Sequence, residues 1–244
     1  MGMRTLLLTA LSALALAGTV RAQPDWAVEL HDRLAQSADA SATTVAITLD
    51  ACGGAYDADI IATLIASRIP ATVFVTKKWL DRNPVGTAML LAHADLFELE
   101  DHGTAHVPAV IGAGRRVYGI AAAPDRAHLE TEVSGAADAI RALTGQAPRY
   151  FRGATAIYDR ESIRAIEALG YRIAGFSVNA DAGASLSRAA IVARLRAVQP
   201  GDVVIAHMNK PRGATAEAFA TVLPELQARG YRFVKLSQAQ LLRS

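Results

Sequence analysis

The stretch Val45-Ala-Ile-Thr-Leu-Asp50 sets the pattern that the rest of the chain repeats. Val45–Leu49 is apolar and rich in β-branched residues, which is typical of a buried strand, and a carboxylate follows it directly. Comparable runs recur at Thr72–Val75, Leu96–Leu99, Tyr150–Phe151, Tyr171–Val178, Val203–Ala206 and Tyr231–Val234. Helical patterns separate most of them, so we predict βαβ units and a parallel sheet. Seven or so units fit either a barrel or an open doubly wound sheet.

Capping and stop residues delimit several of the helices. A Ser or Asp side chain can cap the first turn, and Gly or Pro can end the last one. On this basis we expect helices after Asp57 through Ile69, over Arg160–Leu169 after Asp159, over Arg188–Val198 after Ser187, and from near Thr215 to Gly230. Trp26–Leu34 predicts a short leading helix.

Length and composition bound the class of protein. The 244 residues suffice for one domain with a sizeable core, and 52% of them are hydrophobic while only 20% are charged. Cys52 is the only cysteine, so no internal disulfide can form. We find no linker and no internal repeat that would mark a second folded domain.

The N-terminus has the pattern of an export signal. Arg4 precedes the apolar run Leu6–Val20, and Ala22 offers a small residue at a cleavage site. We therefore expect residues 1–22 to be a signal peptide, 23–43 a lead segment and 44–244 the catalytic domain of a periplasmic or secreted protein. Cleavage removes two of 25 basic residues and leaves 23 against 23 acidic ones. A neutral mature chain gives no reason to expect binding to nucleic acid or to a membrane surface.

Chemically reactive side chains fall where the predicted strands end. They are Asp50, His102 and His106, Arg152, Asn179 and Asp181, and His207. The carboxyl ends of parallel strands meet on one face of such folds, and active sites are built there. We therefore expect these residues to share one site.

Individual residues suggest roles in that site. His102 and His106, four residues apart, can present two imidazoles to one metal ion. Asp50 can ligate a metal or accept a proton. Asp181 can orient His207 and raise its pKa, which would suit a general acid, and Arg152 can stabilise a carboxylate or an oxyanion.

In order and spacing, these motifs resemble those of the NodB-homology polysaccharide deacetylases, carbohydrate esterase family four, over roughly residues 44–236. The family's motif Thr-Phe-Asp-Asp-Gly corresponds here to Thr48–Gly54, and its His-Ser/Thr-x-x-His motif to His102–His106. Its Arg-Pro-Pro-Tyr motif corresponds to Arg152–Thr155. Its Asp-containing stretch corresponds to Ser177–Asp181, and its apolar run ending in His to Val204–His207. The resemblance implies a distorted (β/α)7 barrel, a divalent metal ion, usually zinc, and hydrolysis of acetyl groups from an N-acetylated polysaccharide or oligosaccharide. It also implies that His102, His106 and an aspartate hold the metal, that His207 protonates the leaving amine, and that backbone near Thr155 helps to form an oxyanion hole.

The first motif departs from the family, because Ala51 stands where the second aspartate, a metal ligand, is expected. One solution makes Asp50 a ligand and Asp181 or Asp57 the base. The other makes Asp50 the base and leaves the third ligand unidentified. The loss of Pro-Pro-Tyr leaves Trp79, Tyr56, Tyr118 and Tyr158 as candidates for aromatic contacts with a glycan. Two further functions stay open, a catalytically inactive glycan-binding barrel and a metal amidohydrolase acting on a small non-sugar amide.

Overall fold

The computed structural model describes residues 24–36 and 43–243. The predicted signal peptide lies outside these residues. None of the helices in the described ranges is long and apolar enough to span a bilayer.

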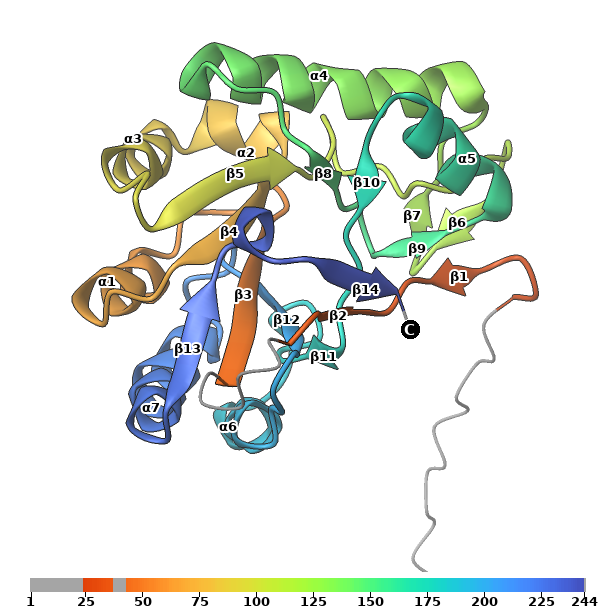
Figure 1. Cartoon of the computed structure of the whole chain (residues 1–244). Helices are drawn as coiled ribbons and strands as arrows, with labels where there is room; N and C mark the ends of the chain where they lie inside the picture. The colour runs from red at the N-terminus through yellow and green to blue at the C-terminus, as the bar shows by residue number, and fades with distance from the viewer. Residues whose placement is uncertain (1–23, 37–42, 244) are drawn as a thin grey trace, which may run out of the picture.

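A curled parallel sheet forms the centre of the molecule, as the sequence predicts (Figure 1). Its spatial order is β10–β8–β5–β4–β3–β12–β11, with β13 paired to the first half of β3. The strands are β3 (Thr43–Ala51), β4 (Ala71–Val75), β5 (Phe97–Asp101), β8 (Tyr150–Phe151), β10 (Arg172–Ile173), β11 (Val178–Asn179), β12 (Val203–His207) and β13 (Tyr231–Val234). With the helices around it, this sheet is the distorted (β/α)7 half-barrel rather than an open doubly wound sheet.

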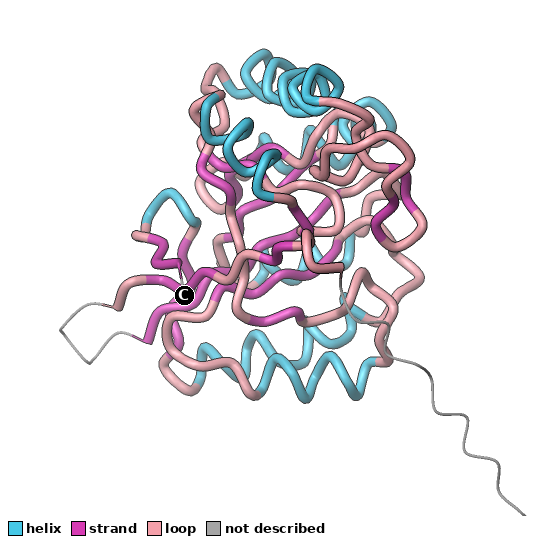
Figure 2. Tube along the Cα trace, turned by 90° about the vertical axis from the view of Figure 1, so that its right-hand side faces the viewer, coloured by secondary structure: helices cyan, strands magenta, loops and turns pink. Residues whose placement is uncertain are grey.

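Helices cover the outer face of the sheet. They are α1 (Ala58–Ala66), α2 (Lys77–Arg82), α3 (Pro84–Ala92), α4 (Arg126–Thr144), α5 (Arg160–Ala168), α6 (Arg188–Arg196) and α7 (Thr215–Ala228). The perpendicular view shows helices above and below the strands (Figure 2). Asp57, Asp159 and Ser187 cap α1, α5 and α6 as predicted. The helix after Asp57 ends three residues before Ile69, where Ser67 and Arg68 turn toward β4.

The central strand β3 is buried on both faces. Val45, Ile47, Leu49 and Ala51 belong to the hydrophobic layer between the sheet and the helices. Ala46 belongs instead to the cluster inside the barrel, and Thr48 and Asp50 contact Arg152 there. This alternation follows from the two-residue period of a strand. Each fully buried Val, Ile or Leu side chain in these layers contributes roughly 1.5–3 kcal/mol to stability.

The leading helix predicted over Trp26–Leu34 is wrong. The segment forms β1 (Val28–Glu29) and β2 (Asp32–Leu34), which pair with β9 (Ile157–Tyr158) and β14 (Leu241–Arg243). Leu30, Asp32 and Leu34 are all buried, which is the two-residue period of a strand. In the sequence the two leucines are four residues apart, a spacing that also fits one face of a helix. Asp32 is neutralised by Arg243 at 2.8 Å, a contact far away in sequence.

The single strand predicted over Tyr171–Val178 is interrupted. β10 and β11 are separate two-residue strands at opposite ends of the sheet order. The residues between them contact the N-terminal segment, since Gly175 donates to Asp32 Oδ2 and Phe176 to the Leu30 carbonyl. The N-terminal segment thus lies against the connection between the two ends of the sheet, beside β14 in Figure 1.

Candidate metal and hydrolytic site

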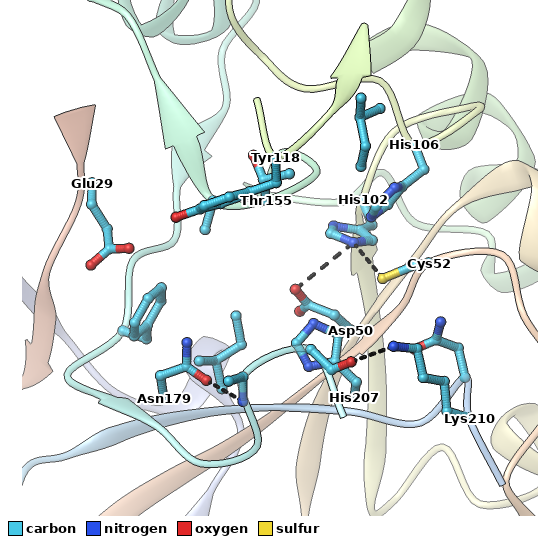
Figure 3. Close-up of a pocket in the computed structure, with 17 residues that line it drawn as sticks. Glu29, Asp50, Cys52, His102, His106, Tyr118, Thr155, Asn179, His207 and Lys210 are labelled. Carbon is cyan, nitrogen blue, oxygen red and sulfur yellow. Dashed lines mark hydrogen bonds and ion pairs between the residues drawn. The ribbon is translucent and has the colours of Figure 1, made fainter. Parts of the chain in front are cut away.

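A cavity of about 600 Å³ opens at the carboxyl ends of the central strands (Figure 3). Its lining includes Asp50, Cys52, His102, His106, Thr155, Asn179, His207, Asn209 and Lys210. The structure therefore brings together side chains that the sequence predicted to share one site. Asp50 and His207 are register partners on β3 and β12, so their side chains lie side by side at the strand ends.

His102 lines the cavity and is anchored by the backbone of Arg152. It follows the last residue of β5, is 1% exposed, and its Nδ1 lies 2.5 Å from the Arg152 carbonyl oxygen. A carbonyl can only accept, so Nδ1 carries the proton and Nε2 is the acceptor, which the protonated Cys52 thiol meets at 3.5 Å. The same nitrogen lies 3.8 Å from Asp50 Oδ2.

The loop that carries His106 is anchored by a buried carboxylate. Glu132 on α4 accepts from the backbone N–H groups of Ala105 and Val107. His106 between them adopts a left-handed conformation with φ of 68°, which costs energy for a non-glycine residue and requires such anchoring. The result is that the His106 ring lies against the His102 ring, with centroids 5.1 Å apart.

Both imidazoles are neutral, the form in which histidine binds a metal ion. Burial lowers the pKa of His102 below its ordinary value. Burial and the neighbouring His102 lower the pKa of His106 to about 3.

Cys52 completes a group of three potential ligands. Ligand atoms of Cys52, His102 and His106 all lie within 4.8 Å of one another. Burial and the carboxylate of Asp50 raise the pKa of the Cys52 thiol well above its ordinary value, so the thiol is protonated when no cation is near. A lone cysteine is usually an apolar filler in the core, but Cys52 follows Asp50 by two residues, the spacing that places strand residues on one face.

Asp50 forms a buried ion pair with Arg152. Nη1 of Arg152 donates to Asp50 Oδ1 at 2.9 Å and to Thr48 Oγ1 at 2.8 Å, and its guanidinium lies over the Phe74 ring. Burial by itself would raise the pKa of Asp50, but Arg152 and the two nearby histidines more than offset it and the pKa lies below its usual range. Asp50 is therefore a carboxylate at neutral pH. Arg152 is fully buried and does not line the cavity, so it acts on the site through Asp50.

His207 and Asp181 form the second buried pair. Asp181 accepts from His207 Nδ1 and from the His207 backbone N–H, both at 2.8 Å, and from Thr215 Oγ1 at 2.9 Å. Burial lowers the pKa of His207, but the bond to Asp181 and the charge of Asp50 raise it, and the net shift is upward. With Nδ1 occupied, Nε2 is the nitrogen that can act on a molecule in the cavity.

Two of the residues considered for the base, Asp57 and Asp181, do not line the cavity. Asp57 caps α1 through the backbone N–H groups of Asp59 and Ile60, and it does not line the cavity. Asp181 lies behind His207 with both oxygens hydrogen-bonded. Asp50 is the carboxylate that faces the cavity beside the histidine pair.

The matched family model is described as polysaccharide deacetylase and aligns with residues 37–174, more than half of the chain. The chain belongs to the polysaccharide deacetylase family. A comparison with curated proteins gives no match.

Solved structures share the polysaccharide deacetylase fold at low sequence identity. One is a CE4 family pseudoenzyme from Bacillus anthracis, with 18% identity and a TM-score of 0.64 over 81% of this chain. The alignment spans 65% of that protein's length. A peptidoglycan N-acetylglucosamine deacetylase has 18% identity and a TM-score of 0.66 over 81% of this chain and 87% of its own. PdaA from Bacillus subtilis, a family 4 carbohydrate esterase, has 16% identity and a TM-score of 0.63 over 82% of this chain and 81% of its own.

Most of the aromatic residues considered for glycan contact lie away from the cavity in this member of the polysaccharide deacetylase family. Trp79 is buried in the core, and the Tyr158 hydroxyl accepts from the Gly153 N–H inside the protein. Tyr56 packs edge-on against Trp79. Tyr118 alone of the four lines the cavity, from the turn between β6 (Arg116–Val117) and β7 (Ile120–Ala121), and it is 74% exposed.

Proposed function

We propose that the protein is a metal-dependent hydrolase that removes acetyl groups from N-acetylated polysaccharide. The observation that carries this proposal is the grouping of three elements in one cavity. These are a neutral histidine pair with ligand spacing, a carboxylate held by a buried guanidinium, and a histidine held by a buried carboxylate. Family membership supports the same chemistry.

The residues present fit a divalent metal ion. His102 and His106 are neutral and oriented by other parts of the chain, as histidine ligands require. A divalent ion there would supply Lewis-acid activation of the acetyl carbonyl and of the attacking water. Zinc is the ion we favour, because imidazole suits it.

Asp50 and His207 divide the proton transfers between them. Asp50 is ionised and lies next to the histidine pair, so we assign it as the base that takes a proton from the attacking water. His207 would donate a proton from Nε2 to the leaving amine, since its Nδ1 is bonded to Asp181. Asp181 and Arg152 are positioning residues, each holding one of these two groups.

Polar atoms without a protein partner suggest how an acetylated sugar is held. Among the described residues, Thr155 Oγ1 and Asn209 Oδ1 are buried without a hydrogen bond, and both residues line the cavity. Buried polar atoms are normally satisfied, so these two are suited to hydroxyl or amide groups of a bound ligand. Thr155 and Ala156 also have left-handed backbone (φ 70° and 54°), which is consistent with a strained turn that contributes to an oxyanion hole.

Acetate release from a panel of N-acetylated glycans tests the proposal. We expect the mature protein to release acetate. A chelator should abolish this release, and added zinc should restore it. Release from small non-sugar amides alone would favour an amidohydrolase. Stable metal binding without release from any substrate would favour the inactive glycan-binding barrel. The similarity to a pseudoenzyme is the observation that supports this alternative.

Metal content should depend on the histidine pair. We expect His102→Ala and His106→Ala to lose nearly all bound metal, since each removes a ligand from a cluster with few donors. Elemental analysis of the purified proteins measures this. His128→Ala is the matched control, because His128 is exposed on α4 and bonded to Asp125. Retention of wild-type metal by either ligand variant would contradict the assignment.

We also propose that the protein is exported, on the strength of the Arg4, Leu6–Val20 and Ala22 pattern. The expected mature protein begins at Gln23. N-terminal sequencing of the exported fraction checks this, and a retained Met1 in that fraction would contradict it.

A further inference from the structure

Cys52 lies on the face of β3 that carries the catalytic groups. Even-numbered residues of this strand point into the barrel, and Asp50 is the last of them within β3. Cys52 is the next residue in this two-residue alternation and lines the same cavity. Ala51 points to the opposite side and is fully buried among the apolar residues between sheet and helices.

The geometry at Cys52 matches that of a coordinated thiolate. Zinc lies about 2.3 Å from sulfur and about 2.0–2.1 Å from imidazole nitrogen, so two tetrahedral ligands of these kinds stand about 3.6 Å apart. Cys52 Sγ and His102 Nε2 are 3.5 Å apart. Nε2 of His102 carries the lone pair, because Nδ1 is committed to the Arg152 carbonyl.

Asp50 is less suited to be the third ligand. Its Oδ1 is held by the buried guanidinium of Arg152, and its Oδ2 stands 3.8 Å from His102 Nε2. Asp50 is also absent from the group of ligand atoms that all lie within 4.8 Å of one another.

We infer that Cys52 is the third metal ligand, giving a thiolate–imidazole–imidazole site in place of the family's carboxylate one. On binding, the S–H bond breaks, the proton passes to solvent and sulfur bonds to the metal. The ligand set keeps a single negative charge, and Asp50 is left free to act as the base. Soft thiolate ligands favour zinc over magnesium or manganese, so this site should select zinc. The inference rests on the proposed metal-dependent function.

Cobalt substitution tests the ligand directly. We expect the Co²⁺-loaded wild type to show a sulfur-to-cobalt charge-transfer absorption in the near ultraviolet. Cys52→Ala and Cys52→Ser should lose that band and bind zinc more than about 100-fold more weakly, since changing even an outer-shell partner costs about 10–100-fold. Asp50→Asn is the matched control and should keep the band.

Alkylation gives a second measurement that needs no variant. Cys52 is the only cysteine, so the extent of labelling by a maleimide reports on it alone. The protonated thiol of the metal-free protein should react slowly at neutral pH, so labelling is followed at alkaline pH, where we expect zinc to protect Cys52 and magnesium at the same concentration not to.

The outcomes separate this inference from the proposed function. Cobalt binding without a charge-transfer band, or equal zinc affinity in Cys52→Ala, would overturn the thiolate ligand even if acetate is released. A wild type that binds no metal would overturn it as well. A protein that shows the band and zinc protection but releases no acetate would support the ligand and contradict the deacetylase function.

Discussion

His207→Ala is expected to lower kcat for acetate release by about 10²–10⁴-fold while leaving bound metal unchanged. The leaving amine of a sugar departs poorly unless it is protonated, and His207 Nε2 is the group we assign to that step. Its Nδ1 is already bonded to Asp181 at 2.8 Å. Steady-state kinetics with metal content measured on the same samples checks this. Loss of metal together with activity would make His207 a ligand instead.

Asp181→Asn should show whether Asp181 only orients the His207 ring or also raises its pKa through the carboxylate charge. The pKa of His207 is raised by Asp181, and the acid is active only in its protonated form. Activity therefore falls as the pH rises through that pKa. Removing the carboxylate charge lowers the pKa, so in Asp181→Asn the fall should begin at lower pH than in the wild type. An unchanged pH–rate profile would show that Asp181 does not hold the charge of His207.

Arg152→Met is expected to cost about 3–5 kcal/mol of unfolding free energy, because it leaves the carboxylate of Asp50 buried without its partner. Asp50 and Arg152 are both almost completely buried, and the guanidinium also donates to the carbonyls of Ala174 and Gly175. Chemical denaturation of the metal-free variants measures the cost without interference from metal binding.

The double variant Asp50→Asn/Arg152→Met tests the pairing itself. With the charge on Asp50 also removed, we expect part of the lost stability to return, so the two substitutions should be strongly non-additive. Additive losses would mean that Arg152 stabilises the barrel through its carbonyl and aromatic contacts and not through Asp50. Activity should be low in both variants, since Asp50 is either mispositioned or absent.

The sequence was sufficient to predict the parallel βα architecture. The central strands β3, β4 and β12 each contain an apolar, β-branched run, and this signal is contained within ten or so residues. Asp159 and Ser187 cap their helices as expected, because a cap is a contact between residues three apart. The leading segment was mispredicted because its conformation depends on pairing with β9 and β14, which lie more than a hundred residues away in the chain.

The sequence by itself determined which reactive residues end the strands, because strand ends can be read from local hydrophobic runs. Only the tertiary structure decided how those residues pair. Arg152 was expected to reach a carboxylate or an oxyanion, and the folded chain turns it inward to Asp50, 102 residues earlier. From the sequence alone Cys52 could lie near the metal, but a lone cysteine is more often an apolar filler of the core. Its closeness to His102 arises from strands β3 and β5 lying on either side of β4, a relation that no local pattern records.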